Sequence, residues 1–424
     1  MKELQVSIEI EGKQHIVGVI EGENHEDARF RYLDEYMNIP GVRPISISLP
    51  FQRESFTPKI TRCFFEGLLP EGFSRKAVAN WIKADEGDYL TILEKLGREC
   101  LGAICIQEKG ALWEESDYEP LSKEHLYALA SEGATKSTKI LMETHLSLTG
   151  ASGKVGLYFD SQNNKWYLPK GKAASTHIVK QSHVRFNSIV LNEQLCMRTA
   201  KKLGIDVPES FIINLGNGTD ADVLYATKRY DRQLFNDRYI GDLRCPYRLH
   251  QEDFAQALGI SASEKYERNN CNYMKRMFKL INDYSSNPVE DRIKLWKMIV
   301  FNYLIGNTDC HVKNYSLLYS SDVKSIRLAP AYDIVCTGVY GITNDMSFYI
   351  GGELDAKKIT RETFAYAANE IAFGEKLAMR IFDDMSDKLE KCIDEAADEL
   401  LSIGFHNVRE VRDSIKRVVK HQSA

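Results

Sequence analysis

Four polar residues interrupt an otherwise apolar segment, FNYLIGNTDCHVKNYSLLY, which covers residues 301–319. They are Asp309, His311, Lys313 and Asn314. Each buried polar group costs about 1–3 kcal/mol unless something satisfies it, so an ordinary core would not collect four of them without partners. The segment is therefore either a polar turn or a functional site.

The spacing between Asp309 and Asn314 suits phosphoryl transfer. It is the D-x-x-x-x-N spacing of a protein-kinase catalytic loop. Such a loop places one carboxylate at the attacking hydroxyl, where it orients or accepts the proton, and one amide oxygen at Mg²⁺. The spacing alone occurs by chance in many proteins, so the hypothesis needs support from elsewhere in the chain.

A second carboxylate strengthens this hypothesis. Asp333 follows a predicted strand in LAPAYDIVCTG and comes after Asn314 in the chain. Phosphoryl transfer needs an anionic ligand that holds Mg²⁺ across the β- and γ-phosphates, and an Asp at the end of a strand suits that role. The alternative for Asp333 is a capping or turn residue.

A glycine-rich stretch, SLTGASGKVGLYF, precedes a predicted strand and suits a loop whose backbone amides face phosphate. It is not a Walker A loop, because G-x-x-G-K is too short and Val155 stands where Ser or Thr would bind Mg²⁺. A glycine-rich hairpin turn is the alternative. The residues predicted to bind nucleotide here are Gly150, Ala151, Ser152, Gly153 and Lys154.

Further parts of a kinase site follow in the expected order. Lys180 in THIVKQ ends a predicted strand, as a lysine that contacts the α/β-phosphates would. Glu193 is predicted in the first turn of the next helix, where it would pair with Lys180, although the helix dipole also favours Glu there. The segment YATKRYDR leaves the β-rich region and would offer its backbone to adenine.

The composition is that of a globular protein with two or three domains. The chain has 424 residues, of which 43% are hydrophobic and 27% are charged. Nine scattered cysteines favour reduced thiols, and the chain lacks a long apolar run or a signal-like start, so we expect a cytoplasmic protein without a membrane segment. A net charge of -5 gives no general attraction to nucleic acid, and the basic tail RDSIKRVVKHQSA is either a local patch or a solvated helix end.

The hydrophobic patterns predict an α+β protein in which a β-rich region precedes a mainly helical one. The predicted domains are residues 1–107, 140–232 and 233–424. An acidic segment at about 110–140 is predicted to be a connector. The predicted strands cover residues 4–10, 15–22, 46–49, 155–159, 166–170, 176–180, 211–214 and 224–230, and the predicted helices cover 26–37, two stretches within 72–97, 192–204, 286–305 and 375–404.

Eight motifs in this order resemble the HipA family of bacterial serine/threonine kinases, the toxin half of a toxin–antitoxin pair. The resemblance covers most of the chain and implies a protein-kinase-like two-lobe fold, with an extra N-terminal α+β subdomain, and use of ATP and Mg²⁺. The similar motifs are FFEGLLPEGFSR, SLTGASGK, THIVK, NE at 192–193, KRYDR, RLHQEDFAQALG, GNTDCHVKN and AYDIV.

The resemblance implies a role for each matching residue. Asp309 would be the catalytic base, Asn314 and Asp333 the Mg²⁺ ligands, and Lys180 a ligand of the ATP phosphates. His311 and Lys313 would lie near phosphate or substrate, although a structural histidine is the alternative for His311. The adenine-binding hinge would comprise Lys228, Arg229, Tyr230 and Asp231.

Ser147 matches the serine that such kinases phosphorylate in themselves. The added negative charge in a phosphate-binding loop would repel ATP and switch the kinase off. Thr149 and Ser152 depart from the family's usual Ala and Gln, so either is an alternative acceptor. Lys228 stands where an acidic residue is common, which leaves adenine binding at this position to the backbone. Cys310, beside Asp309, is interpreted as a small packing residue.

The resemblance also implies partners: a HipB-like DNA-binding antitoxin, with DNA bound only as a complex with that antitoxin, and a protein substrate such as an aminoacyl-tRNA synthetase. Two other functions stay open from the sequence. One is a small-molecule or lipid kinase of related fold. The other is a catalytically idle regulatory protein that binds its antitoxin and operator DNA.

Overall fold

The computed structural model describes residues 2–111, 115–132, 134–144, 153–182 and 185–422. The chain forms two compact units, each built from separate stretches of sequence. Among the described residues, no helix has both the length and the apolar character needed to cross a bilayer. Unit 1 comprises Met1–Gln181, Ala226–Ala262 and Leu317–Ile326, and unit 2 comprises Ser182–Tyr225, Ser263–Ser316 and Arg327–Ala424.

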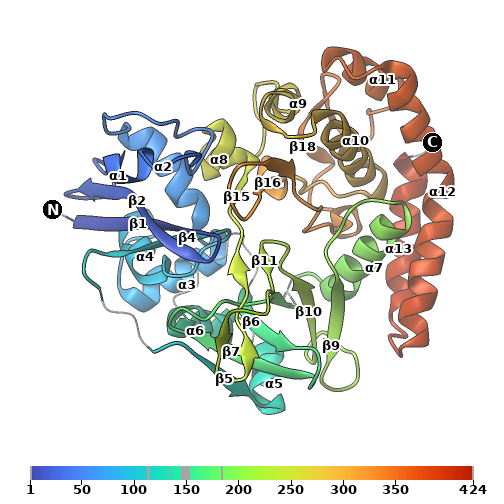
Figure 1. Cartoon of the computed structure of the whole chain (residues 1–424). Helices are drawn as coiled ribbons and strands as arrows, with labels where there is room; N and C mark the ends of the chain where they lie inside the picture. Colours follow the sequence, from blue (N-terminus) through green and yellow to red (C-terminus); the bar gives the residue numbers. More distant parts are fainter. Residues whose placement is uncertain (1, 112–114, 133, 145–152, 183–184, 423–424) are drawn as a thin grey trace. The chain divides into compact units, whose positions relative to one another are not determined.

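The first part of unit 1 is a four-stranded antiparallel sheet with helices beside it (Figure 1). The strand order is β3-β2-β1-β4. A tight turn at Gly12, with φ of 76°, joins β1 to β2. The strands are β1 (Lys2–Ile10), β2 (Lys13–Gly22), β3 (Arg29–Tyr32) and β4 (Ile104–Glu108). The helices are α1 (Asp34–Met37), α2 (Pro58–Phe65), the 3-10 helix η1 (Glu66–Leu68), α3 (Gly72–Ile82) and α4 (Tyr89–Leu96).

Two sequence predictions are wrong in this part. The helix predicted over 26–37 is strand β3 followed by the short helix α1. Phe30 and Tyr32 are both buried and alternate with exposed or half-buried arginines, which is the two-residue period of a strand. The strand predicted over 46–49 is a turn, in which Ser46 is buried by a contact described below.

The strands of the second sheet that lie wholly or partly in unit 1 follow the order β5-β7-β6-β8-β10. Its edge strand β5 and the two following helices lie in the segment predicted to be a connector, which is a correction. Tyr118 is buried there even though its neighbours are exposed, so the polar composition reflects an edge strand with one solvated face. The elements are β5 (Asp117–Leu121), α5 (Lys123–Ser131), α6 (Ala134–Thr144), β6 (Lys154–Asp160), β7 (Lys165–Lys170), β8 (His177–Gln181) and β10 (Val223–Lys228).

Short strands follow β10, where the sequence predicted mainly helices. They pair as β11 with β14 and β12 with β13, and β15 joins β16 and β17. Segments of two or three residues carry too little periodicity to reveal strands. The elements are β11 (Arg232–Gln233), β12 (Tyr239–Ile240), β13 (Leu243–Arg244), β14 (Tyr247–Arg248), β15 (Gln251–Asp253), α8 (Phe254–Leu258), η2 (Ala262–Glu264), β16 (Ser316–Tyr319) and β17 (Ile326–Leu328).

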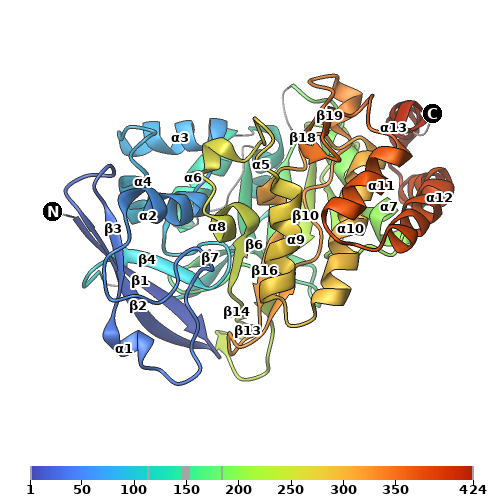
Figure 2. The same cartoon turned by 90° about the horizontal axis from the view of Figure 1, so that it is seen from above.

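Unit 2 is mainly helical, and its long helix α12 packs against α7, α10, α11 and α13 (Figure 2). Trp296 of α10 is fully buried and donates to the carbonyl of Ala378 at 3.1 Å, which fixes α10 against α12. The helices predicted near 286–305 and 375–404 are confirmed. The elements are α7 (Ile189–Lys202), β9 (Ser210–Asn214), α9 (Tyr273–Tyr284), α10 (Pro288–Ile305), η3 (Val312–Asn314), η4 (Thr337–Tyr340), β18 (Asp345–Ile350), β19 (Glu353–Asp355), α11 (Arg361–Glu370), α12 (Glu375–Ser402) and α13 (Val408–Gln422).

Candidate active site

The loop that carries Asp309 begins where α10 ends. Gly306 caps that helix in the left-handed region, with φ of 77°, and a Cβ there would lie 2.5 Å from Cγ1 of Val418. The next residue, Asn307, is buried and donates to Oδ1 of Asn302 at 2.8 Å. Its own Oδ1 accepts the backbone N–H of Asp309 at 3.1 Å. The end of α10 therefore sets the position of the Asp309 backbone.

Two side chains hold the loop on the other side, at Thr308. The N–H of Thr308 donates to Oγ1 of Thr337 at 2.7 Å, and the hydroxyl of Ser347 donates to the Thr308 carbonyl at 2.7 Å. Thr337 also contacts the Gly306 carbonyl at 3.2 Å. Both backbone groups of Thr308 are thus satisfied by side chains from distant segments, which rigidifies the loop next to Asp309.

Asp309 and Asn314 lie within the same short loop, as their spacing predicts. The side-chain N–H of Asn314 donates to the Asp309 carbonyl at 2.8 Å, and the N–H of His311 reaches the same oxygen at 2.9 Å. The Asp309 side chain is exposed and accepts a hydrogen bond from Tyr266, a residue that the sequence did not single out. Because Asn314 uses its amide nitrogen in the loop, its amide oxygen is the atom that suits a metal.

The structure ties Asp333 to this loop through the residue before it. The hydroxyl of Tyr332 donates to the Lys313 carbonyl at 2.8 Å and contacts the hydroxyl of Ser316 at 2.6 Å. Asp333 itself has φ of 58°, in the left-handed region that residues with a side chain rarely adopt. Such backbone strain persists where the surroundings enforce it, and it is typical of functional sites.

The other polar residues of the loop are more enclosed than Asp309. His311 and Lys313 are 7% and 6% exposed, so both residues are buried, and their contact with phosphate or substrate stays a prediction. Cys310 is buried, and burial raises the pKa of its thiol to about 12. The burial agrees with the interpretation of Cys310 as a small packing residue.

In unit 1, two of the lysines predicted to bind phosphate lie opposite each other on neighbouring strands. Lys154 of β6 lies opposite Lys180 of β8 in the antiparallel register, and residues at opposed positions project from the same face. Gly153 precedes Lys154, and a Cβ there would lie 2.3 Å from Nε2 of Gln181. A larger residue at position 153 would therefore have to displace the end of the Gln181 side chain. Two ammonium groups on one face beside this glycine suit an anionic ligand.

Several predicted loop residues lie outside the residues that the structure describes. They include every hydroxyl proposed for autophosphorylation, so those roles stay predictions. The residues concerned are Ser147, Thr149, Gly150, Ala151 and Ser152.

Glu193 does not lie in the first turn of its helix, which is a correction. Helix α7 begins at Ile189, three residues before the predicted start at residue 192, so Glu193 lies in the second turn and is 5% exposed. The helix dipole therefore does not explain a glutamate at this position, because its effect falls off within the first turn. The pairing of Glu193 with Lys180 stays a prediction.

The predicted hinge begins at Lys228, the exposed last residue of β10, and continues directly after that strand. The N–H of Arg229 donates to the Thr176 carbonyl at 2.8 Å, and the hydroxyl of Tyr230 donates to Oε1 of Gln251. The side chains of Arg229 and Asp231 are buried and bind each other at 2.9 and 2.7 Å. Any nucleotide contact by Arg229 or Asp231 therefore falls to their backbone atoms, and the hinge stays a prediction.

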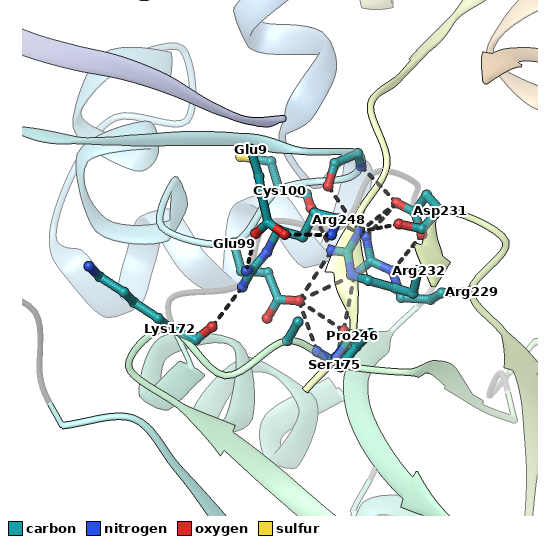
Figure 3. Close-up of polar contacts among 12 residues, drawn as sticks. Glu9, Glu99, Cys100, Lys172, Ser175, Arg229, Asp231, Arg232, Pro246 and Arg248 are labelled. Atoms are coloured by element: carbon teal, nitrogen blue, oxygen red, sulfur yellow. Dashed lines mark hydrogen bonds and ion pairs between the residues drawn. The ribbon is translucent and has the colours of Figure 1, made fainter. Parts of the chain in front are cut away.

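This pair belongs to a buried charge cluster that the sequence did not predict (Figure 3). Asp231 accepts the N–H of Gly102 at 2.7 Å and pairs with Arg232 at 3.1 Å. Arg232 also pairs with Glu99 at 3.3 Å. Burial opposes ionisation of Asp231, but Arg229 and Arg232 outweigh it, so the pKa of Asp231 lies well below its ordinary value. The cluster is thus ionised and its charges are matched.

A second pair extends the cluster. Arg248 binds Glu9 of β1 at 3.3 Å and donates to the Lys172 carbonyl at 3.2 Å (Figure 3). Burial raises the pKa of Glu99, but Arg248 and the two other arginines outweigh it, so that pKa is lowered. Glu9 and Glu99 thereby bind arginines of the segment that follows β10, within unit 1.

The motif RLHQEDFAQALG supplies another buried contact in unit 1. Glu252 accepts hydrogen bonds from the Ser46 hydroxyl at 2.5 Å, the Ile47 N–H at 3.1 Å and the Tyr319 hydroxyl at 2.6 Å. Burial nevertheless raises the pKa of Glu252 to about 7. The neighbouring His250 is also buried, which lowers its pKa to about 4. Glu252 thus holds a proton in the folded protein at pH values where it would ionise in the unfolded chain.

We expect Glu252→Gln to remove a pH-dependent part of the stability. The pKa of Glu252 is raised from 4.5 to about 7, so its contribution is fully present below pH 4.5 and is lost as pH rises through 7. Glutamine keeps the shape and does not titrate. Between pH 4.5 and 7, the free energy of unfolding of the unaltered protein should fall by up to about 3 kcal/mol more than that of the variant. Urea unfolding at each pH measures this difference. The exposed Glu54→Gln is the control, and an equal pH dependence in both variants would contradict the assignment.

Comparisons with known proteins agree with these observations. Residues 8–107 match the family model described as HipA N-terminal domain, and residues 146–393 match the HipA-like C-terminal domain. A protein of Sinorhizobium fredii named putative kinase Y4mE is 30% identical, over 94% of both chains. The serine/threonine-protein kinase toxin HipA of Shewanella oneidensis is 28% identical, over 74% of this chain and 72% of that one.

A solved structure supports the fold. It is described as the Shewanella oneidensis toxin–antitoxin system HipA, HipB and operator DNA complex, and it matches with a TM-score of 0.77 at 22% identity over 99% of both chains. The predicted α+β, kinase-like fold is therefore confirmed. The domain division at residues 107, 140 and 232 stays a prediction. With both of its domains matched, the chain belongs to the HipA family.

Proposed function

We propose that this protein is an ATP- and Mg²⁺-dependent serine/threonine protein kinase and the toxin of a HipBA-like toxin–antitoxin module. One observation carries the proposal. Asp309 and Asn314 share one braced loop, and the residue before Asp333 is hydrogen-bonded to that loop. In this arrangement Asp309 would supply a carboxylate for the acceptor hydroxyl, and Asn314 and Asp333 would supply two oxygen ligands for a metal.

The donor atoms fit Mg²⁺. The amide oxygen of Asn314 and the carboxylate of Asp333 are hard ligands, which Mg²⁺ prefers. Among the described residues, no group of three or more His, Cys, Asp or Glu side chains is arranged to hold a metal by itself. Mg²⁺ usually binds through one or two protein ligands together with substrate phosphates and waters, so this sparse set suits it. When bound, the ion would neutralise charge on the phosphates.

ATP would bind through residues of unit 1. Lys154 and Lys180, on one face of β6 and β8, would contact the phosphates. The glycine-rich residues before Lys154 would cover them with backbone amides, and the backbone of residues 228–231 would contact adenine. His311 and Lys313 are further candidates for contact with phosphate or substrate.

The reaction is an in-line displacement at the γ-phosphorus. Asp309 would orient the acceptor hydroxyl and take its proton, while the acceptor oxygen forms a bond to phosphorus. The bond between the γ-phosphorus and the bridging oxygen breaks, and ADP leaves. The rigid backbone around Asp309 holds the base in position before substrate arrives.

The named relatives support the choice of partners. A relative is called a serine/threonine-protein kinase toxin, and the matching structure contains HipB and operator DNA. We therefore propose a HipB-like antitoxin for this chain, with DNA bound only through that complex, and a cytoplasmic location. The protein substrate would be a translation component such as an aminoacyl-tRNA synthetase. Phosphorylation of Ser147, Thr149 or Ser152 would switch the kinase off.

Labelling with [γ-³²P]ATP in a bacterial lysate tests the proposal. With Mg²⁺, the protein should label a protein on serine or threonine, and EDTA should abolish the signal. Asp333→Asn should lose the labelling, whereas Asp387→Asn, an exposed Asp on α12, should retain it. Labelling of small hydroxylated molecules without any labelled protein would instead identify a small-molecule kinase.

A further inference from the structure

Tyr266 lies against the loop that carries Asp309. Its hydroxyl donates to Oδ1 of Asp309 at 2.5 Å. Its ring meets His311 edge to face, with 5.2 Å between the ring centroids and an interplanar angle of 81°. Tyr266 is 40% exposed, so it stands at the surface of the loop rather than in the core.

The position of Tyr266 is fixed by the next residue, Glu267. Glu267 is 3% exposed, its N–H donates to the Ser347 carbonyl at 2.8 Å, and its Oε2 accepts the Tyr349 N–H at 2.9 Å. Ser347 also donates through its hydroxyl to the Thr308 carbonyl at 2.7 Å, directly before the candidate base. One stretch of β18 thus holds both the segment that carries Tyr266 and the loop that carries Asp309. A surface tyrosine that met the loop by chance would lack these contacts.

We propose that Tyr266 is a positioning residue for Asp309. The torsion that turns a carboxylate is broad, so an exposed Asp samples many orientations unless a partner restrains it. The Tyr266 hydroxyl binds Oδ1 and so restrains the rotation of the carboxylate. This inference rests on the proposed kinase function and assigns a role to a residue outside the D-x-x-x-x-N loop.

Tyr266→Phe tests the role, because it keeps the ring against His311 and removes only the hydroxyl. We expect kcat for phosphate transfer from Mg²⁺-ATP to fall about ten-fold, the size expected for one lost hydrogen bond to a charged group. KM for ATP should stay within about two-fold, since the substitution keeps the ring contact with His311 and removes only the hydroxyl that binds Asp309. A disordered site would raise KM as well.

The matched control is Tyr284→Phe, which removes a hydroxyl of similar exposure, 43%, at the end of α9. It should leave both constants unchanged. A Tyr266→Phe rate equal to that of the control would overturn the inference. A faster rate would also overturn it, because Tyr266 would then be blocking the acceptor position. If the unaltered protein transfers no phosphate, the proposed function fails and this inference falls with it.

Discussion

Asp309→Asn is expected to lower kcat for phosphate transfer about a thousand-fold or more, with little change in KM for ATP. Asparagine cannot accept the acceptor's proton, and positioned general bases contribute about 10²–10⁴ in rate. The backbone contacts of Asp309 with Asn307 and Asn314 do not involve its carboxylate, so they persist. Initial rates of phosphate incorporation at saturating Mg²⁺-ATP measure the effect.

The control for this variant is Asp387→Asn, which removes an exposed carboxylate of the same unit. It should leave kcat unchanged, and thermal unfolding should show both variants folded. A loss of less than about ten-fold in Asp309→Asn would mean that this carboxylate is not the base, and the loop would lose its assigned role.

The second large effect concerns stability. Asp231→Asn should lower the free energy of unfolding by about 3–5 kcal/mol, because it leaves the buried Arg229 and Arg232 with Glu99 as their one shared counter-charge among the described contacts. Arg229 has no exposed side-chain surface and Arg232 has 2%, so neither can turn toward water without disrupting unit 1. The Gly102 N–H would also lose a charged acceptor. Urea unfolding followed by circular dichroism measures the change.

Asp242→Asn is the matched substitution, at an exposed turn residue between β12 and β13. It should change the free energy of unfolding by less than about 0.5 kcal/mol. If Asp231→Asn changes the free energy of unfolding equally little, the stability of the cluster does not depend on the charge of Asp231. It would then resemble buried ion pairs that neutral residues can replace without loss.

The core of the site could be predicted from the sequence because it is local. Asp309 and Asn314 occupy one loop after one helix, so their distance along the chain fixes their distance in space. The helix that precedes them is marked by Pro288 in its first turn and Gly306 at its end. Asp333 was predictable as a candidate, whereas the Tyr332 contact that ties it to the loop required the structure.

The rest depends on contacts between distant segments. Asp231 meets Gly102 across 129 positions, and Tyr266 meets Asp309 across 43. A charge or hydroxyl in a sequence does not specify its partner, so neither contact leaves a local signal. The hinge prediction is limited for the same reason. Arg229 and Asp231 have the residue types of a binding site, but their side chains bind each other within the buried cluster.

The misassigned elements also have a physical cause. Residues 26–37 hold apolar side chains at spacings that fit a helix, but the alternation of Phe30 and Tyr32 and the pairing of Tyr32 with Gly18 make a strand. The polar composition of residues 110–140 predicts a connector. Its edge strand needs only one buried face, which Tyr118 supplies.

The most direct test of the central claim is intact mass, followed by peptide mapping, after incubation with ATP and Mg²⁺ beside an Asp309→Asn control. Starting from protein shown to be unmodified, we predict one added phosphate on Ser147, Thr149 or Ser152, and none in the control. That result would establish phosphoryl transfer through Asp309. The same phosphate in both samples, or no phosphate in either, would contradict the account.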